Sequence, residues 1–489
     1  MNQRNDNLFA KHRGAMRQFS THAPRDPTLY NEDLAPTPSD ERDWGWFELF
    51  NVWANDVQSL FGYTLAASLF VTYGLNGWAV FAGIVLAGFV VMGLVNLIGK
   101  PSVEHGIPFP VMARASMGVR GANFPAMIRA VVAIFWFGVQ TYFASTALAL
   151  AFIALIGSNG PPVFLGLSSI ECIAFLAVWA FQIMLFWNGI DLIVDFLNFA
   201  GPFVYVVMVT LAVTIWIEVG NDLWLELGTI FRGTGNYHGS SLGAFVAIVG
   251  TMIAYFSAVV INFGDFSRFV RSEHEMRKGN LLGLPINIAF FSLIALIVTA
   301  GTVALWGEPM TNPTAIVARI DSLPLTILAA ITFFAATVGI NLVANFIPPA
   351  YDLANLMPSR INFRVAGIIT SACALVIGGL WVSTISQIGI LGLVNTLGAV
   401  LAPIYGIIIV DYYLVKSGRL DVDQLFSASR DGAYFYTNGW NMAAIVSFVL
   451  PATFSVLTVW VPMLNALSGF AWVIGAGFGG VFYWAIAKR

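Results

Sequence analysis

Two side chains with complementary chemistry lie one helical turn apart in an uncharged segment. Residues 131–151 contain no charged residue, and they place Trp136 four positions before Gln140. An apolar segment of this length predicts a membrane-spanning helix. A carboxamide in such a helix needs hydrogen-bond partners, and an indole face stacks on flat rings. The pair therefore indicates a carrier for a small, flat, polar molecule.

A second polar pair lies in another apolar segment, at Asn341 and Asn345. Their spacing again puts both side chains on one helical face. Carboxamides donate and accept, so Gln140 and Asn345 together match the alternating N–H and C=O groups of a cyclic amide or pyrimidine. The alternative is that these amides tie neighbouring helices together.

Asp56 is an acidic residue near the middle of the apolar segment 47–74. A charge at that depth is costly, so the carboxyl is protonated, paired or in contact with water. One interpretation is a group that couples transport to a proton or another cation. The other is a carboxylate satisfied by unwound backbone or by a neighbouring helix. Trp53, Tyr255 and Phe256 are further aromatic candidates, although most aromatic residues in membranes serve packing or interface belts.

Composition places the whole chain in a membrane. Of the 489 residues, 58% are hydrophobic and only 10% are charged, against about 25% charged in soluble domains. The net charge of -3 argues against nucleic-acid binding. We interpret Cys172 and Cys373, both in apolar segments, as packing residues. No phosphate-binding glycine loop, nucleophile elbow or metal-ligand cluster is present, so an enzyme is not expected.

Hydropathy predicts an all-α membrane protein with twelve spans. The spans run over 47–74, 77–99, 123–157, 164–187, 191–218, 242–263, 281–307, 322–350, 362–382, 385–415, 440–461 and 464–487.

These spans divide the chain into four parts. Residues 1–46 read as a flexible tail, 47–415 as a ten-helix core, 416–439 as a loop and 440–489 as two additional helices. Five spans followed by five more suggest an inverted repeat, in which span one matches span six and span three matches span eight. Spans one and six both carry small or polar residues where a helix can break: Asn55, Asp56, Gln58, Ser59 and Gly62 in the first, and Gly250, Thr251, Ser257 and Asn262 in the second.

The basic residues predict the orientation. If both termini are cytoplasmic, all of the 23 Lys and Arg residues except Arg232 and Arg319 lie inside. The reversed orientation inverts this bias and is rejected. The expected location is therefore the cell (inner) membrane, with both termini in the cytoplasm.

The chain resembles the nucleobase:cation symporter-1 family over nearly its whole length from Tyr30 onward. The resemblance is carried by YNEDLAP (30–36), HGIPFPVMARASMGVRGANFPAMIRA (105–130), FWFGVQT (135–141), DFSRF (265–269), ANFIPPAYDLAN (344–355), INF (361–363) and LAPIYGIIIVDYYLVKSGRLDVDQLF (401–426). It implies a leucine-transporter-like core of five plus five helices with two more at the C-terminus. It also implies secondary transport of nucleobases, hydantoins or allantoin.

The resemblance assigns roles to individual positions. Trp136 matches the family's stacking indole, and Gln140 and Asn345 match its substrate-binding amides. Phe256 falls where many members carry a second stacking Trp. Ser59, next to Gln58, falls where the family has Gln or Asn, which puts one substrate hydrogen bond in doubt.

The cation site departs from the family pattern. In a sodium-coupled member, spans one and eight supply backbone carbonyls, here at Asn55, Gln58 and Ala336, and span eight adds two hydroxyls. Those hydroxyl positions are Gly339 and Ile340 in this chain. Because a hard cation needs oxygen ligands, either water replaces the lost hydroxyls or coupling uses protons. Asp56, which is absent from the sodium-site pattern, favours protons.

The sequence thus predicts a symporter that imports a planar nitrogen-rich ring by alternating access, coupled to H⁺ or Na⁺. Trp136 and Phe256 sandwich the ring; Gln140 and Asn345, with Gln58, Ser59 and Asn341, read its polar edges. A uracil-like pyrimidine is favoured, with allantoin or hydantoin next. The alternative is an uncoupled facilitator or channel for the same rings. No cofactor, nucleic acid or protein partner is expected; the partners are the substrate and membrane lipid.

Overall fold

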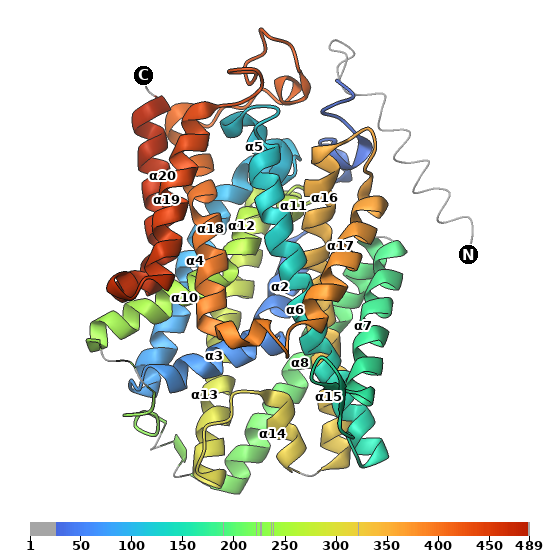
Figure 1. Cartoon of the computed structure of the whole chain (residues 1–489), viewed down its shortest axis with the longest axis vertical. Helices are drawn as coiled ribbons and strands as arrows, with labels where there is room; N and C mark the ends of the chain where they lie inside the picture. Colours follow the sequence, from blue (N-terminus) through green and yellow to red (C-terminus); the bar gives the residue numbers. More distant parts are fainter. Residues whose placement is uncertain are drawn as a thin grey trace.

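The computed structural model describes residues 26–188, 190–221, 223–224, 227–235, 237, 239–320 and 322–487. It is an elongated bundle of helices (Figure 1). The helices are α2 (Trp46–Val57), α3 (Leu60–Thr72), α4 (Gly77–His105), α5 (Phe109–Met117), α6 (Asn123–Ile156), α7 (Ser169–Trp187), α8 (Ile190–Val219), α10 (Ser241–Ile261), α11 (Gly264–Ser267), α12 (Glu273–Leu281), α13 (Asn287–Trp306), α14 (Pro313–Ile320), α15 (Leu323–Ile340), α16 (Ile347–Leu356), α17 (Phe363–Gly379), α18 (Ile390–Val410), α19 (Met442–Trp460) and α20 (Ala471–Ala487). Strands β1 (Pro162–Phe164) and β2 (Leu167–Ser168) form one small antiparallel hairpin.

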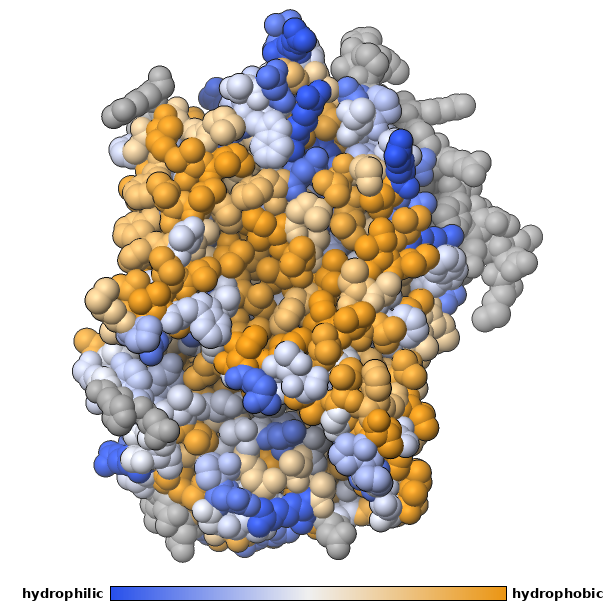
Figure 2. All heavy atoms as spheres, in the orientation of Figure 1, coloured by the Kyte–Doolittle hydropathy of each residue, from blue (hydrophilic) through white to orange (hydrophobic). Residues whose placement is uncertain are grey.

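Ten helical segments of the described chain are long and apolar enough to cross a membrane. Leu60–Thr72 and Phe363–Gly379 are apolar but shorter, and they belong to the predicted spans 47–74 and 362–382. Hydrophobic residues cover a broad band of the surface, while hydrophilic residues gather toward the two ends (Figure 2). This distribution is that of a bundle surrounded by lipid.

The first span is broken in its middle, as the polar residues there predict. Helix α2 ends at Val57 and α3 begins at Leu60. Ser59 has an extended backbone and accepts a hydrogen bond from the amide of Gly62, so its side chain caps α3. Gln58 and Ser59 therefore lie at the joint between two half-helices.

The sixth span breaks at one of its four predicted positions, Asn262. Helix α10 runs unbroken through Gly250, Thr251 and Ser257, and the chain leaves it only at Asn262, before the short α11. Gly250 has a packing role: a Cβ there would lie 1.5 Å from the carbonyl oxygen of Gly469. The absent side chain allows close contact with η8 (Pro462–Phe470), and no break follows from it.

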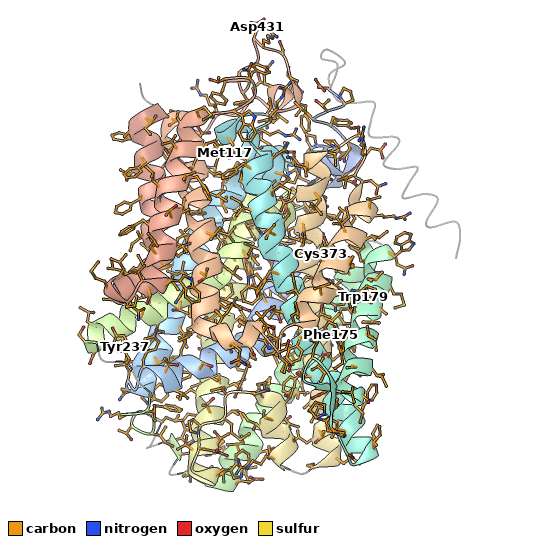
Figure 3. The ribbon with its side chains drawn as sticks, in the orientation of Figure 1. Met117, Phe175, Trp179, Tyr237, Cys373 and Asp431 are labelled. Carbon is orange, nitrogen blue, oxygen red and sulfur yellow. The ribbon has the colours of Figure 1, made fainter. Side chains whose placement is uncertain are left out.

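The eighth span contains an irregular turn in its middle. Helices α15 and α16 are joined by a π-helical segment, η4 (Asn341–Phe346), which carries both predicted asparagines. Helix α6 packs against α15, η4, α16 and α17. On the outer side of this group, Trp179 of α7 donates to the carbonyl of Ser371 on α17 at 2.9 Å; Figure 3 shows Trp179 and Phe175 close to Cys373 of α17.

One end of the bundle is covered by segments that are distant in the sequence, and we name it the α5 end. Met117 of α5 and Asp431 both lie there (Figure 3), and Arg114 of α5 donates to the carbonyl of Leu425 at 3.0 Å. Helices α19 and α20 pack against α18, beside the predicted ten-helix core.

Residues 26–46, predicted as part of a flexible tail, are packed at the α5 end. They form two short 3₁₀ turns, η1 (Glu32–Leu34) and η2 (Ser39–Glu41), and Leu34 is fully buried. The guanidinium of Arg268 donates to Asp33 O, Ala35 O and Thr37 Oγ1 of this segment. The rest of the predicted tail, residues 1–25, lies outside the described residues.

Candidate functional site

The predicted aromatic pair is separated by a third ring. Trp136 of α6 meets Phe61 edge-on at 4.7 Å between ring centroids, and it meets Tyr255 of α10 edge-on at 6.2 Å. Phe256 packs against Tyr255 at 4.9 Å and against Trp53 at 6.3 Å. Trp136 and Phe256 thus flank Tyr255, which sequence reasoning ranked with the packing residues. Its proximity to Trp136 depends on how α10 and α6 cross, which no local pattern encodes.

Gln140 is buried without hydrogen-bond partners for its oxygen. Its side chain is 2% exposed, and its Oε1 has no partner among the described residues. An orphaned polar atom in a membrane interior costs about 1–3 kcal/mol, so a ligand that donates a hydrogen bond is stabilised here. The Oε1 of Gln140 is therefore one of several buried oxygens of the described chain that can accept a further hydrogen bond.

The two asparagines of η4 are bound differently from one another. Asn341 directs its Nδ2 to Gln182 Oε1 at 2.7 Å, Phe137 O at 3.0 Å and Thr141 Oγ1 at 3.1 Å. These bonds tie η4 to α6 and α7, which is the role of helix-linking amides in membrane bundles. Asn345 donates to Asn341 Oδ1 at 3.0 Å and is 5% exposed. The geometry therefore favours Asn345 over Asn341 as a ligand contact.

The joint in the first span holds the other predicted polar contacts. Ser59 Oγ lies 3.4 Å from the hydroxyl of Tyr255. Gln58 donates from Nε2 to Asn287 Oδ1 at 3.4 Å, while its buried Oε1 has no partner among the described residues. Both side chains thus face α10 and α13 from the break.

The predicted cation residues gather around the same joint. Asp56 accepts from the Tyr255 hydroxyl at Oδ1, 3.0 Å away, and forms no ion pair among the described residues. Asn55 donates to the carbonyl of Asn51 at 2.8 Å. Ala336 and Gly339 are buried in α15.

Sequence reasoning missed one hydroxyl in this region. Thr337 is fully buried, and its Oγ1 accepts from the amide of Leu60 at 3.1 Å, across the break from α15. The sequence signal was available, because Thr337 directly follows Ala336. Gly339 and Ile340 supply no side-chain oxygen, and Thr337 adds a buried hydroxyl to the oxygens of Asp56, Gln58 and Ser59 around this joint.

A buried arginine, Arg129, hydrogen-bonds to two other spans beside the candidate site. Arg129 of α6 is fully buried and donates to Ala258 O and Asn262 Oδ1 at the end of α10, and to Ala344 O in η4. One guanidinium therefore links three spans just beside Asn345. Two further buried carboxyls, Asp265 and Asp352, accompany it.

The structure is closed around the candidate site. Trp136, Phe256 and Asn345 are at most 5% exposed. A cavity found in the described part has a volume of about 20 Å³, room for about one water molecule, and lies among α3, α4, α10 and α13. Among the predicted site residues, only Phe256 lines it. A flat ring needs a further opening between α6 and the broken helices.

A broken first span, an interrupted sixth span and buried unpaired polar atoms beside them define a membrane transporter of the leucine-transporter fold. The comparison with solved structures agrees. The chain superposes with a TM-score of 0.75, at 23% identity, on Mhp1, a nucleobase-cation-symport-1 family transporter in a closed conformation with bromovinylhydantoin bound, covering 94% of this chain and 95% of that one.

Residues 36–475 match the family described as permeases for cytosine/purines, uracil, thiamine and allantoin. The allantoin permease of Bacillus subtilis (strain 168) is 34% identical over 93% of this chain and 92% of its own length. The purine-uracil permease NCS1 of Arabidopsis thaliana is 30% identical over 87% of this chain and 70% of its own. The chain belongs to this nucleobase:cation symporter-1 family, which consists of permeases and not of enzymes.

Proposed function

We propose that the protein is a symporter that imports a small ring with adjacent N–H and C=O groups, driven by a cation gradient. The observation that carries this proposal is the buried, unpartnered Oε1 of Gln140, one helical turn from Trp136. An N–H on the ring edge satisfies that oxygen, and the indole stacks on the ring face.

Uracil, allantoin and hydantoin all present such an edge. Uracil-like pyrimidines remain the first candidates from the sequence, and the similarity to an allantoin permease puts allantoin beside them. Asn345 uses its Nδ2 to donate to Asn341, and its oxygen is the acceptor that we assign to a second N–H of the ring.

Cation coupling is supported by the surroundings of Asp56. An ionised carboxyl that is buried without a cationic partner is costly. Among the described residues, the carboxyl of Asp56 accepts a hydrogen bond from the Tyr255 hydroxyl and has no cationic partner. A proton or a sodium ion bound beside it removes that cost, and alternating access then carries ion and ring together.

The proposed orientation places the α5 end in the cytoplasm. Most basic residues of the described chain belong to this end, whereas Arg319 lies by Glu308, in the connection between α13 and α14. Labelling of a cysteine introduced at Asp431 from one side of the membrane tests this directly.

The test of function is uptake by cells of radiolabelled uracil, allantoin, hydantoin and cytosine, with and without sodium and with a protonophore. We expect accumulation against a gradient that collapses when the coupling ion is removed. Equilibration without accumulation would instead identify an uncoupled facilitator.

The Gln140→Ala variant tests the site itself. Loss of the carboxamide removes a hydrogen bond to the ring, so the half-saturation constant should rise roughly tenfold or more. Gln387→Ala, at an exposed glutamine in the connection after α17, is the matched control. Uptake by Gln140→Ala with unchanged half-saturation would remove Gln140 from the site.

A further inference from the structure

Tyr255 is enclosed by the aromatic residues of the candidate ring site. Its ring stacks on Phe61 at 6.0 Å with an interplanar angle of 14°, and meets Trp136 edge-on at 6.2 Å. Phe61 in turn contacts Trp136 at 4.7 Å. The three rings form a closed set of contacts, so a ligand that stacks on Trp136 also constrains the Tyr255 ring.

The hydroxyl of Tyr255 points away from this set, to the break in the first span. It donates to Asp56 Oδ1 at 3.0 Å and to Asp56 O at 3.2 Å, and it lies 3.4 Å from Ser59 Oγ. These atoms belong to the last turn of α2 and to the joint that follows. One residue of α10 therefore holds the broken end of α2 through its hydroxyl.

The backbone around the joint leaves room for this hydroxyl and for little else. A Cβ at Gly62 would lie 3.1 Å from the Tyr255 hydroxyl and 3.0 Å from the carbonyl oxygen of Val57. Any side chain at position 62 therefore presses on the hydroxyl. Gly62 keeps the contact between α10 and the joint short.

The carbonyl that the hydroxyl contacts, Asp56 O, lies between the predicted cation-site carbonyls in the chain. Asn55 precedes Asp56 and Gln58 follows Val57, so the position of the α2 end sets where their carbonyl oxygens lie. Helix α15 reaches the same joint from the other side, where Thr337 accepts from Leu60. Tyr255 is thus in contact with the ring site on one side and with the cation site on the other.

We propose that Tyr255 is the positioning residue through which ring binding and cation binding influence one another. A ring stacked on Trp136 fixes the Tyr255 ring, the hydroxyl then fixes the end of α2, and the cation finds its carbonyl oxygens in place. By reciprocity, a bound cation raises the affinity for the ring by the same factor. This inference rests on the proposed function and adds the residue that links the two sites.

The experiment compares wild type, Tyr255→Phe and a control, Tyr405→Phe. Tyr405 is also a buried tyrosine, and its hydroxyl donates to a backbone carbonyl, that of Leu94 at 3.0 Å, far along the chain from the joint. Substrate affinity is measured on purified protein at saturating and at limiting concentration of the coupling cation. The ratio of the two affinities is the coupling factor.

In wild type and Tyr405→Phe we expect a coupling factor of roughly five or more. In Tyr255→Phe the factor should fall to about one, since the ring of residue 255 remains while the hydroxyl that holds the end of α2 is lost. A merely structural hydroxyl would lower stability and leave the ratio intact. Gly62→Ala, which keeps Tyr255 and crowds its hydroxyl, should lower the ratio in the same direction and serves if Tyr255→Phe does not fold.

A wild-type coupling factor in both folded variants would overturn the inference while leaving the proposed function standing. Loss of ring binding in folded Tyr255→Phe at every cation concentration would also overturn it, because the hydroxyl would then belong to the ring site. If the substrate affinity of the wild-type protein did not change with any cation tested, the proposed symport itself would be refuted.

Discussion

Replacing Arg129 by Gln should weaken the link among the third, sixth and eighth spans. The guanidinium donates from Nε to Ala258 O at 2.9 Å and to Asn262 Oδ1 at 3.0 Å, and from Nη2 to Asn262 Oδ1 at 2.6 Å and to Ala344 O at 2.9 Å. Glutamine is too short to reach all of them. Three acceptors therefore lose a charged donor in a fully buried place.

The magnitude follows from these contacts. A hydrogen bond to a charged group contributes about 1.5–3 kcal/mol in soluble proteins, while polar contacts inside membrane bundles average about 0.6 and reach about 1.7 kcal/mol. Taking roughly 1 kcal/mol for each of the three acceptors gives about 3 kcal/mol.

Thermal or denaturant unfolding of the purified protein in detergent measures this loss. Arg129→Lys should recover part of it, because the ammonium still reaches one acceptor. Arg277→Gln is the control, since Arg277 is exposed and, among the described residues, its one ion pair is with Glu273 one turn away, an interaction of about 0.5 kcal/mol. Equal stability of Arg129→Gln and Arg277→Gln would refute the idea that this guanidinium clamps the three spans.

Two further changes test packing and charge. Gly250→Ala should prevent stable folding, because its Cβ would overlap the carbonyl oxygen of Gly469. Gly477→Ala is the control: a Cβ there has nothing within 4 Å, so this variant should express and melt like wild type. Detergent-solubilised yield and melting temperature measure both effects, and a well-folded Gly250→Ala would contradict the close contact. Burial raises the pKa of Asp33 above 3.8, against the lowering effect of its hydrogen bond from the Phe363 amide. A carboxyl whose pKa is raised by folding binds its proton more tightly when folded, so its contribution to stability is lost as pH rises from 3.8 through the raised pKa. Asp33→Asn should therefore gain stability relative to wild type over that window, and parallel stability curves would show that Asp33 does not titrate abnormally.

The sequence predicted those parts of the site that depend on local spacing. Trp136 and Gln140 share a face because a helix repeats every 3.6 residues, and the polar run at Gln58 and Ser59 marked the break of the first span. Of the four candidate positions for the sixth-span break, Asn262 was right, whereas Gly250 serves a crossing with a residue more than two hundred positions later. Sequence spacing carries no information on such a contact.

Tyr255 shows the same limit within the site. In the sequence it is one aromatic residue in an apolar helix, and packing is the ordinary role of such residues. The role of its hydroxyl depends on the fold, in which α10 brings it within hydrogen-bond distance of Asp56, 199 positions earlier. Likewise, residues 26–46 were predicted to be a flexible tail because they are polar. In the folded chain, carbonyl oxygens of this segment accept hydrogen bonds from the buried Arg268.

The contact of Arg268 with the segment before the first span bears on where this carrier can be shortened. Among the described residues, the hydrogen-bond acceptors of its side chain, Asp33 O, Ala35 O and Thr37 Oγ1, all come from that segment. In a chain that starts at residue 47, the guanidinium, 5% exposed in the folded protein, loses these three acceptors and the segment that covers it. The polar segment ahead of the first span is thus part of the folded core, because it supplies hydrogen-bond acceptors to a buried arginine. A purification tag therefore belongs upstream of Asp26.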